Sequence, residues 1–289
     1  MDGQGDVIGD DVPEQTPKTI ENEVVDYYQG YDERSRLISG AGLLEFLRLK
    51  EIIQRFVEPP PGVVLDVGGG PGRYSCWMAR LGYEVHHIDP VPKHVEQARL
   101  ASTVQPDHPL ASASLGDARS LDVTDASADV VLLMGPLYHL QSHTDRIRTL
   151  REAYRVLKPD GKLIATAINR FASLIDGLVS GYIDDPVFIP ILDGDLTDGR
   201  HLPETSTPEG YFTTAFLHLP EELESEIDEV GFRQETLISV QGPGEYATEL
   251  DERLSDPDRR EQLLGLIRRV ETERTLLGMA SHFVVIAEK

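Results

Sequence analysis

The sequence predicts an α/β fold with a doubly wound, mostly parallel sheet and added helical segments. Three observations support this prediction. Short apolar runs alternate with helical segments between residues 63 and 169, a glycine-rich turn follows the first run, and two long stretches interrupt the pattern later. Such alternation favours a parallel sheet with right-handed crossover connections. A chain of 289 residues is long enough for one such domain with insertions.

The N-terminal part is expected to contain two segments. Residues 1–18 are acidic and polar, lack the basic and apolar regions of a secretory signal, and predict a flexible tail. Residues 19–57 place apolar side chains at helical spacing, with a break near Ser39–Gly42, and predict helices. Three prolines at 59–61 end this segment, because proline lacks an N–H donor and restricts the residue before it.

Residues 58–169 carry the alternating pattern of the predicted core. The runs are short, apolar and rich in β-branched residues, as in strands buried on both faces. Strands are expected within 63–68, 84–89, 110–118, 128–135 and 162–169, and helices at 72–82, 91–102 and 143–161.

Two insertions are predicted after the core. Residues 170–219 are too long for an ordinary connection, and insertions of this length usually carry function. Residues 220–289 return to the core, with a helix at 221–232 and a closing strand at 282–289. Between them, residues 233–242 predict a strand and residues 243–281 a second helical insertion.

Charge and composition restrict the function. The net charge of −23 disfavours bulk nucleic acid and anionic membranes as partners, since both repel an acidic surface. No apolar run is long enough to predict a membrane span, and the cytoplasm is the expected location. The nine histidines show no metal-ligand spacing, so no metal site is expected.

The glycine turn after the first strand predicts a ligand site. Glycine permits positive φ angles and a close approach of the backbone to a ligand, and open α/β sheets bind ligands at the carboxyl ends of their strands. The spacing G-x-G-x-G, with Pro71 inside the turn, differs from the dinucleotide pattern G-x-G-x-x-G and argues against NAD or FAD. Asp89, at the end of the second strand, is suited to bind two ribose hydroxyls, or else is a plain turn residue.

Three stretches together, VLDVGGGPG, HHID and GDARSLDVTDASADVVLLMGPLYHL, resemble class I S-adenosylmethionine-dependent methyltransferases. The resemblance is strongest to the small-molecule group that includes the UbiE-like, type 11 enzymes, and covers roughly residues 60–168. It implies a Rossmann-like seven-stranded sheet whose last strand is antiparallel. It also implies S-adenosylmethionine as cofactor, S-adenosylhomocysteine as product, a small-molecule acceptor, and a lid role for residues 19–57.

The resemblance further implies which residues bind the cofactor. The methionine moiety would be held by Asp66 and by the turn of Gly68, Gly69, Gly70 and Gly72, with the Met134 carbonyl nearby. The ribose and adenine would be bound by Asp89, Pro90, Asp117 and the Ala118 amide. Arg73 would pair with the cofactor carboxylate or is a solvated residue of the first helical turn. Tyr27 and Tyr28 would close over the cofactor or pack in the core.

Catalysis and acceptor binding rest on fewer signals. His139 follows the fourth strand and is either a general base for the acceptor or a structural residue at the next helix, and Tyr138 beside it has the same two interpretations. An aromatic cluster is expected either to bind an apolar acceptor or to pack the insertion on the sheet: Tyr211, Phe212, Phe216 and His218. Two other functions stay open, a cofactor-binding protein without catalysis and an NAD-dependent oxidoreductase. The sequence names neither the accepting atom nor the oligomeric state.

Overall fold

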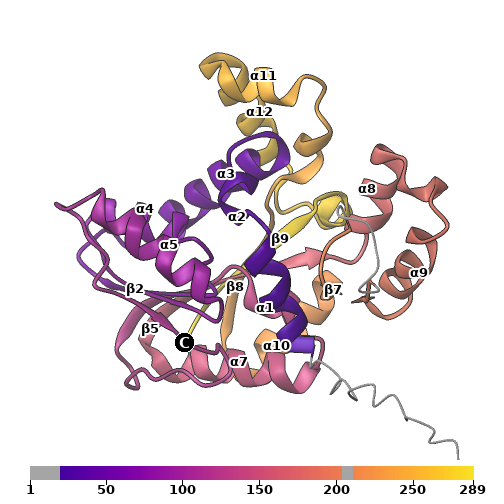
Figure 1. The fold of residues 1–289 in the computed structure, drawn as a ribbon. Coiled ribbons are helices and arrows are strands. Elements are labelled where there is room, and N and C mark those ends of the chain that lie inside the picture. The colour runs from indigo at the N-terminus through magenta and orange to yellow at the C-terminus, as the bar shows by residue number, and fades with distance from the viewer. Residues whose placement is uncertain (1–19, 204–210) are drawn as a thin grey trace, which may run out of the picture.

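The computed structural model describes residues 20–203 and 211–289, and in it a central sheet lies between two layers of helices (Figure 1). The predicted tail of residues 1–18 lies outside the described residues. Within the described ranges, no helix combines the length and the apolar character that crossing a membrane requires.

Seven strands form the main sheet. In spatial order they are β3 (Ser112–Leu115), β2 (Glu84–Asp89), β1 (Val63–Val67), β4 (Ala128–Leu133), β5 (Leu157–Asn169), β9 (His282–Glu288) and β8 (Arg233–Ser239). The first five are mutually parallel, and β9 runs antiparallel to both β5 and β8. This arrangement confirms the predicted sheet with an antiparallel last strand. It also brings the carboxyl ends of β1, β2 and β4 to one edge.

Two short strands extend β5 beyond the main sheet. The last residues of β5 pair in parallel with β7 (Ala215–His218), which pairs with β6 (Arg200–His201). Strand β7 pairs there because β5 continues past the end of β4 and offers a free edge, and all four residues of β7 are buried. The end of the first insertion is therefore anchored to the sheet, which the sequence pattern did not indicate.

Each face of the sheet has its own apolar core. One face packs against α7 (His143–Val156) and α10 (Pro220–Val230), and the other against α3 (Gly40–Phe56) and α4 (Arg73–Leu81), with α5 (Pro92–Thr103) beside α4 (Figure 1). Helix α7 ends five residues before the predicted boundary, because Leu157 already pairs with Ala128 of β4. The short helix α6 (Pro136–His139) follows β4 directly.

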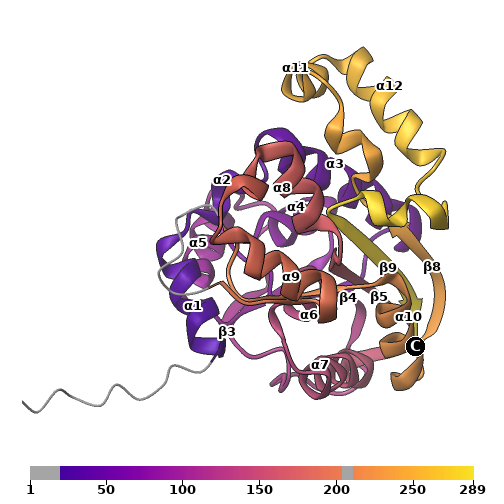
Figure 2. The ribbon, with the colours of Figure 1, turned by 90° about the vertical axis from the view of Figure 1, so that its right-hand side faces the viewer.

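The remaining helices lie around the carboxyl edge of the sheet. The N-terminal part forms α1 (Ile20–Gly30) and α2 (Glu33–Arg36), at the left in Figure 2, and the first insertion forms α8 (Ala172–Ser180), η1 (Tyr182–Asp184) and α9 (Phe188–Asp198). The second insertion comprises η2 (Gly242–Tyr246), α11 (Leu250–Ser255), α12 (Pro257–Arg268) and η3 (Arg274–Met279). Leu44 of α3 joins α11 and α12 in a separate apolar cluster.

Candidate functional site

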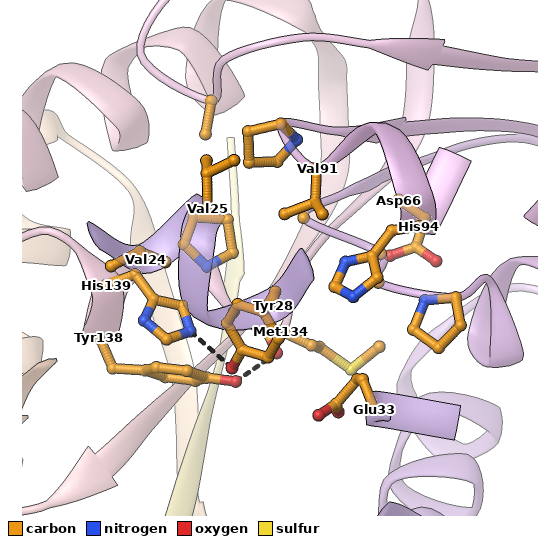
Figure 3. A pocket seen from close by; sticks show the side chains of 18 of the residues that line it. Val24, Val25, Tyr28, Glu33, Asp66, Val91, His94, Met134, Tyr138 and His139 are labelled. Carbon is orange, nitrogen blue, oxygen red and sulfur yellow. Dashed lines mark hydrogen bonds between the residues drawn. The ribbon is translucent and has the colours of Figure 1, made fainter. Parts of the chain in front are cut away.

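A cavity of about 170 Å³ lies at the carboxyl ends of β1, β2 and β4, beneath α1 (Figure 3). Its wall includes most of the cofactor residues that the sequence predicts: Tyr28, Asp66, Gly68, Gly69, Gly70, Arg73, Pro90, Asp117, Ala118 and Met134. The catalytic candidate His139 and its neighbour Tyr138 line it as well. Gly72, Asp89 and Tyr27 are not part of this wall. Gly72 packs against Ala98, and Tyr27 stacks on Tyr31.

Asp66 presents a buried carboxylate to this cavity. Its Oδ2 accepts a hydrogen bond from the Ser75 hydroxyl, which in turn lies 2.9 Å from Nδ1 of His87. Its Oδ1 has no hydrogen-bond partner among residues 20–203 and 211–289. Burial raises the pKa of the Asp66 carboxyl, with the neighbouring His87 opposing the shift. An unpartnered carboxylate oxygen at the cavity wall is suited to accept hydrogen bonds from a cationic ligand group.

The glycine turn has a shape that larger residues would disturb. Gly68 has a φ of 70°, and a Cβ there would lie 2.7 Å from Cγ of Pro136. Gly70 has a φ of 56°, and its N–H donates to Oδ2 of Asp89 at 2.8 Å. The turn is thus fixed from outside by a carboxylate, while its inner side faces the cavity.

Asp89 is buried and supports the cavity from behind. Besides Gly70, its carboxylate accepts from the Val91 N–H at 2.9 Å and faces Nδ1 of His94 at 3.1 Å. These three neighbours therefore already use three of the about four lone-pair directions in which a carboxylate can accept hydrogen bonds. The predicted bond from Asp89 to both ribose hydroxyls stays a prediction, and in this structure the carboxylate organises the loops on either side.

The opposite end of the cavity contains polar groups of the loop after β3. Asp117 pairs with Arg119, whose Nη2 lies 2.6 Å from the carboxylate. Partial burial would raise the pKa of Asp117, but hydrogen bonds from Arg119 hold it below its usual value. Ala118 and Pro90 also line this end. A carboxylate beside small, partly apolar side chains is suited to accept a hydrogen bond from one edge of a flat heterocycle.

Tyr28 closes the cavity on the α1 side. Its ring lies between those of His139 and His94, at 5.4 and 5.3 Å, and its hydroxyl forms a 3.1 Å hydrogen bond with Nε2 of His139 (Figure 3). Burial lowers the pKa of His139 to about 4. The Tyr138 hydroxyl donates to the Met134 carbonyl at 3.0 Å, so the carbonyl predicted to face the cofactor has a protein donor.

Two arginines bring positive charge to the cavity. The Arg73 guanidinium lies 4.6 Å from the centre of the Phe46 ring and has no carboxylate partner in the described parts of the chain. Arg36 pairs with Glu45 and Glu33, each at 2.6 Å. Sequence reasoning missed Arg36 and Glu45; the available signal was a carboxylate within the apolar face of a predicted helix.

A second cavity, of about 410 Å³, adjoins the first. Tyr28, Arg36 and Tyr138 line both. The rest of its wall comes from α3, from the ends of β5, β7 and β9, and from both insertions: Ala41, Ile168, Ala172, Ser173, Asp176, Val179, His201, Phe212, Leu217, Glu245, Tyr246, Ser281 and His282. Of the residues that line this cavity, the sequence singled out Tyr28, Tyr138 and Phe212, and it missed His201, Tyr246 and His282.

Three members of the predicted aromatic cluster lie outside both cavities. The Tyr211 hydroxyl donates to Asp185 at 2.6 Å. Phe216 packs against the Arg146 guanidinium at 3.7 Å, and His218 is buried with its Nε2 3.4 Å from Glu226. The structure therefore brings Phe212 and Tyr138 together at the second cavity but not Tyr211, Phe216 or His218. In the described residues, no three His, Cys, Asp or Glu side chains are grouped to hold a metal ion.

Comparison with known proteins gives matches in sequence. Residues 65–165 match the family described as a methyltransferase domain. A ubiquinone biosynthesis O-methyltransferase of Xanthomonas axonopodis pv. citri is 38% identical over 126 residues, which are 42% of this chain and 48% of the relative. The chain thus spans about half the length of the curated relatives it matches.

Solved structures extend the similarity over most of the fold. An S-adenosylmethionine-dependent methyltransferase from Methanosarcina mazei aligns with a TM-score of 0.56 at 20% identity, covering 82% of this chain and 96% of the other. A protein from Pyrococcus horikoshii OT3 aligns with a TM-score of 0.59 at 17% identity, covering 91% and 98%. The predicted fold and the resemblance of the core to class I S-adenosylmethionine-dependent methyltransferases are confirmed, and the cofactor that they imply is S-adenosylmethionine.

Proposed function

We propose, from the match of residues 65–165 to a methyltransferase domain, that this chain transfers a methyl group from S-adenosylmethionine to a small organic acceptor. The observation that carries the proposal is the meeting of two cavities at Tyr28, Arg36 and Tyr138. A methyl transfer needs two ligands whose reacting atoms are adjacent and shielded from water. Two adjoining cavities under one lid satisfy this need.

The first cavity fits the cofactor. The unpartnered Oδ1 of Asp66 would accept from the ammonium group of the methionine moiety, and Arg73 would pair with its carboxylate. Asp117 and the Ala118 amide would bind the adenine edge, and Pro90 would pack beside it. Gly70 and Asp89 would hold the turn against the ligand.

The cofactor supplies a methyl group that is already activated on a sulfonium, so the protein contributes mainly orientation and the exclusion of water. Helix α1 excludes water by placing Tyr28 over the junction of the cavities. Tyr28 and Tyr138 both have pKa values raised by burial, so their hydroxyls stay protonated and act as hydrogen-bond donors. Neither tyrosine is suited to accept a proton at neutral pH.

The acceptor would occupy the second cavity. Its wall is mixed, with Ile168, Leu217 and Phe212 beside His201 and Tyr246, as is usual for a small organic ligand. The curated relatives are named ubiquinone biosynthesis O-methyltransferases, which supports an oxygen nucleophile in this chain as well. Both insertions contribute to this wall, so the acceptor itself is set by parts of the chain outside the matched domain. The cytoplasmic location stays a prediction.

Two experiments test the proposal. A thermal-shift comparison is expected to show stabilisation by S-adenosylhomocysteine and none by NAD, which separates a methyltransferase from an oxidoreductase. Incubation with a methyl-labelled cofactor and a pool of small metabolites, followed by mass identification, is expected to give a methylated product. Asp66→Asn is the negative control and is expected to lose activity. Asp122→Asn is the same change at an exposed position and is expected to keep activity. Cofactor binding without any labelled product would favour the binding protein without catalysis.

A further inference from the structure

His201 and Asp195 form a buried pair in the first insertion. Asp195 lies on α9 and is fully buried, and His201 lies on β6 with 3% of its surface exposed. Nδ1 of His201 lies 2.9 and 3.0 Å from the two carboxylate oxygens of Asp195. Because a carboxylate only accepts hydrogen bonds, Nδ1 carries the proton and Nε2 is left with its lone pair.

Nε2 of His201 has no hydrogen-bond partner in the described ranges, although it is buried. Buried polar atoms in native proteins are nearly always paired, so an unpaired one requires an explanation. His201 lines the second cavity, beside Phe212, whose ring centre lies 6.4 Å from its own. A ligand in that cavity is the partner that the geometry offers to Nε2.

The other histidine considered for catalysis is in a different state. Nε2 of His139 is already hydrogen-bonded to Tyr28, and burial lowers the pKa of His139 to about 4. Phe212 lies beside both histidines, with the His139 ring 5.6 Å from its centre. His139 is thus engaged with the lid, while His201 is held by a carboxylate and has a free acceptor atom.

We propose that His201 is the general base for a hydroxyl acceptor in the second cavity and that Asp195 is its positioning residue. This inference rests on the proposed methyl transfer and narrows it to an organic hydroxyl, such as a phenol. The acceptor O–H bond breaks and its proton moves to Nε2. The oxygen forms the new bond to the methyl carbon, and the electron pair of the breaking C–S bond stays on sulfur, which becomes a neutral thioether.

The carboxylate of Asp195 supports this step in two ways. It fixes the tautomer in which Nε2 accepts, and it stabilises the imidazolium that forms. The other titratable groups around the cavity are Tyr28 and Tyr138, whose pKa values burial raises, Arg36, which is paired with Glu45, and Asp176, Glu245, Tyr246 and His282. Glu245 accepts from the Ser281 N–H and hydroxyl, and His282 is paired with Gln241, so each has a partner within the protein.

The test uses the full chain with the acceptor found by the labelled-methyl screen. His201→Gln is expected to lower kcat by about 10²–10⁴-fold, because glutamine cannot take the proton. Its affinity for S-adenosylhomocysteine is expected to stay at the wild-type value. Asp195→Asn is expected to lower kcat less and to move the acidic limb of the pH–rate profile to lower pH, since the imidazolium loses its counter-charge. The exposed His143→Gln and Asp193→Asn are the matched controls.

A second readout does not depend on turnover. Nitrogen-15 NMR of the chain alone is expected to show His201 as the Nδ1–H tautomer, with an Nε2 resonance that shifts when phenol is added with S-adenosylhomocysteine. Wild-type kcat in His201→Gln overturns the assignment, and so does an Nε2–H tautomer. A kcat loss with an unchanged pH profile and a lower melting temperature in both variants makes the pair a structural contact instead. If the wild-type chain yields no product, the proposed function fails and the base assignment falls with it.

Discussion

Replacing Asp89 with asparagine tests whether the glycine turn is held in place from behind. The carboxylate accepts from the N–H groups of Gly70 and Val91 and faces Nδ1 of His94. An asparagine has only one acceptor oxygen, so its NH₂ group must point at one of these neighbours. If the oxygen stays with Val91 and His94, the Gly70 N–H loses its partner.

The expected magnitude follows from that one lost bond. A buried donor left without a partner costs about 1–3 kcal/mol. Asp89 is only 3% exposed, so little solvent can replace the bond. If this cost falls on the conformation of the turn that is proposed to bind the cofactor, the Kd for the cofactor product rises about 5- to 150-fold, since each 1.4 kcal/mol is about a factor of ten.

The assay is calorimetric titration of Asp89→Asn with S-adenosylhomocysteine, together with urea unfolding of the variant without ligand. Asp122→Asn, an exposed change of the same kind in the same domain, is the control and is expected to retain wild-type values. Wild-type affinity and stability in Asp89→Asn would show that the Gly70 bond does not hold the turn. A loss of affinity much above 150-fold would instead indicate that Asp89 also binds the ligand directly.

Three further predictions concern the lid and the buried charges. Tyr28→Phe removes the hydroxyl that pairs with His139, and we expect it to lower the free energy of unfolding by about 1–3 kcal/mol and to weaken S-adenosylhomocysteine binding. The control Tyr27→Phe is expected to leave both quantities nearly unchanged. Equal effects of the two variants in urea unfolding and calorimetry would contradict this prediction. Lys93 donates to the carbonyls of Tyr28, Gln29 and Tyr31 and so holds the end of α1. Lys93→Met is therefore expected to speed hydrogen exchange in residues 20–31, while the exchange rates in β1 and β4 stay the same. Unchanged exchange in α1 would show that Lys93 does not hold this helix. Burial would raise the pKa of Glu226, but hydrogen bonds from His218 and Arg146 lower it, and burial lowers the pKa of His218. Both groups therefore contribute stability that is present above their unfolded pKa values, about 4.3 and 6.5, and is lost as the pH falls through the folded ones. The urea midpoint is expected to fall below about pH 6.5 through His218 and again below about pH 4.3 through Glu226, and this second fall is expected to be smaller in Glu226→Gln; equal slopes below about pH 4.3 would refute the assignment.

The sequence was sufficient where the determining pattern is local. The runs at 63–68, 84–89 and 128–135 are apolar enough to require burial on both faces, and each forms a strand that differs from the predicted range by no more than two residues. The glycine turn followed from residue type alone, because the φ angles of Gly68 and Gly70 are disfavoured for other residues.

What the sequence did not predict depends on contacts between distant segments. Strand β7 exists because β5 extends past β4, which no pattern within Ala215–His218 reveals. Arg36 and Glu45 lie on separate helices, and Asp195 meets His201 only because β6 turns back beside α9. His139 was predicted from its place after β4, but its state is set by burial under α1 and by Tyr28, which precedes it by 111 residues.

Helix α1 and the segment that follows it contribute residues to both cavities, Tyr28 and Arg36. If the first ligand to bind restricts the motion of this segment, it bears the entropy lost in doing so, and the second ligand meets walls that are already set. The two affinities are then thermodynamically coupled, and by linkage each ligand strengthens the other by the same factor. A chain arranged in this way favours the complex that contains both reactants over either complex with one, before any bond is made or broken.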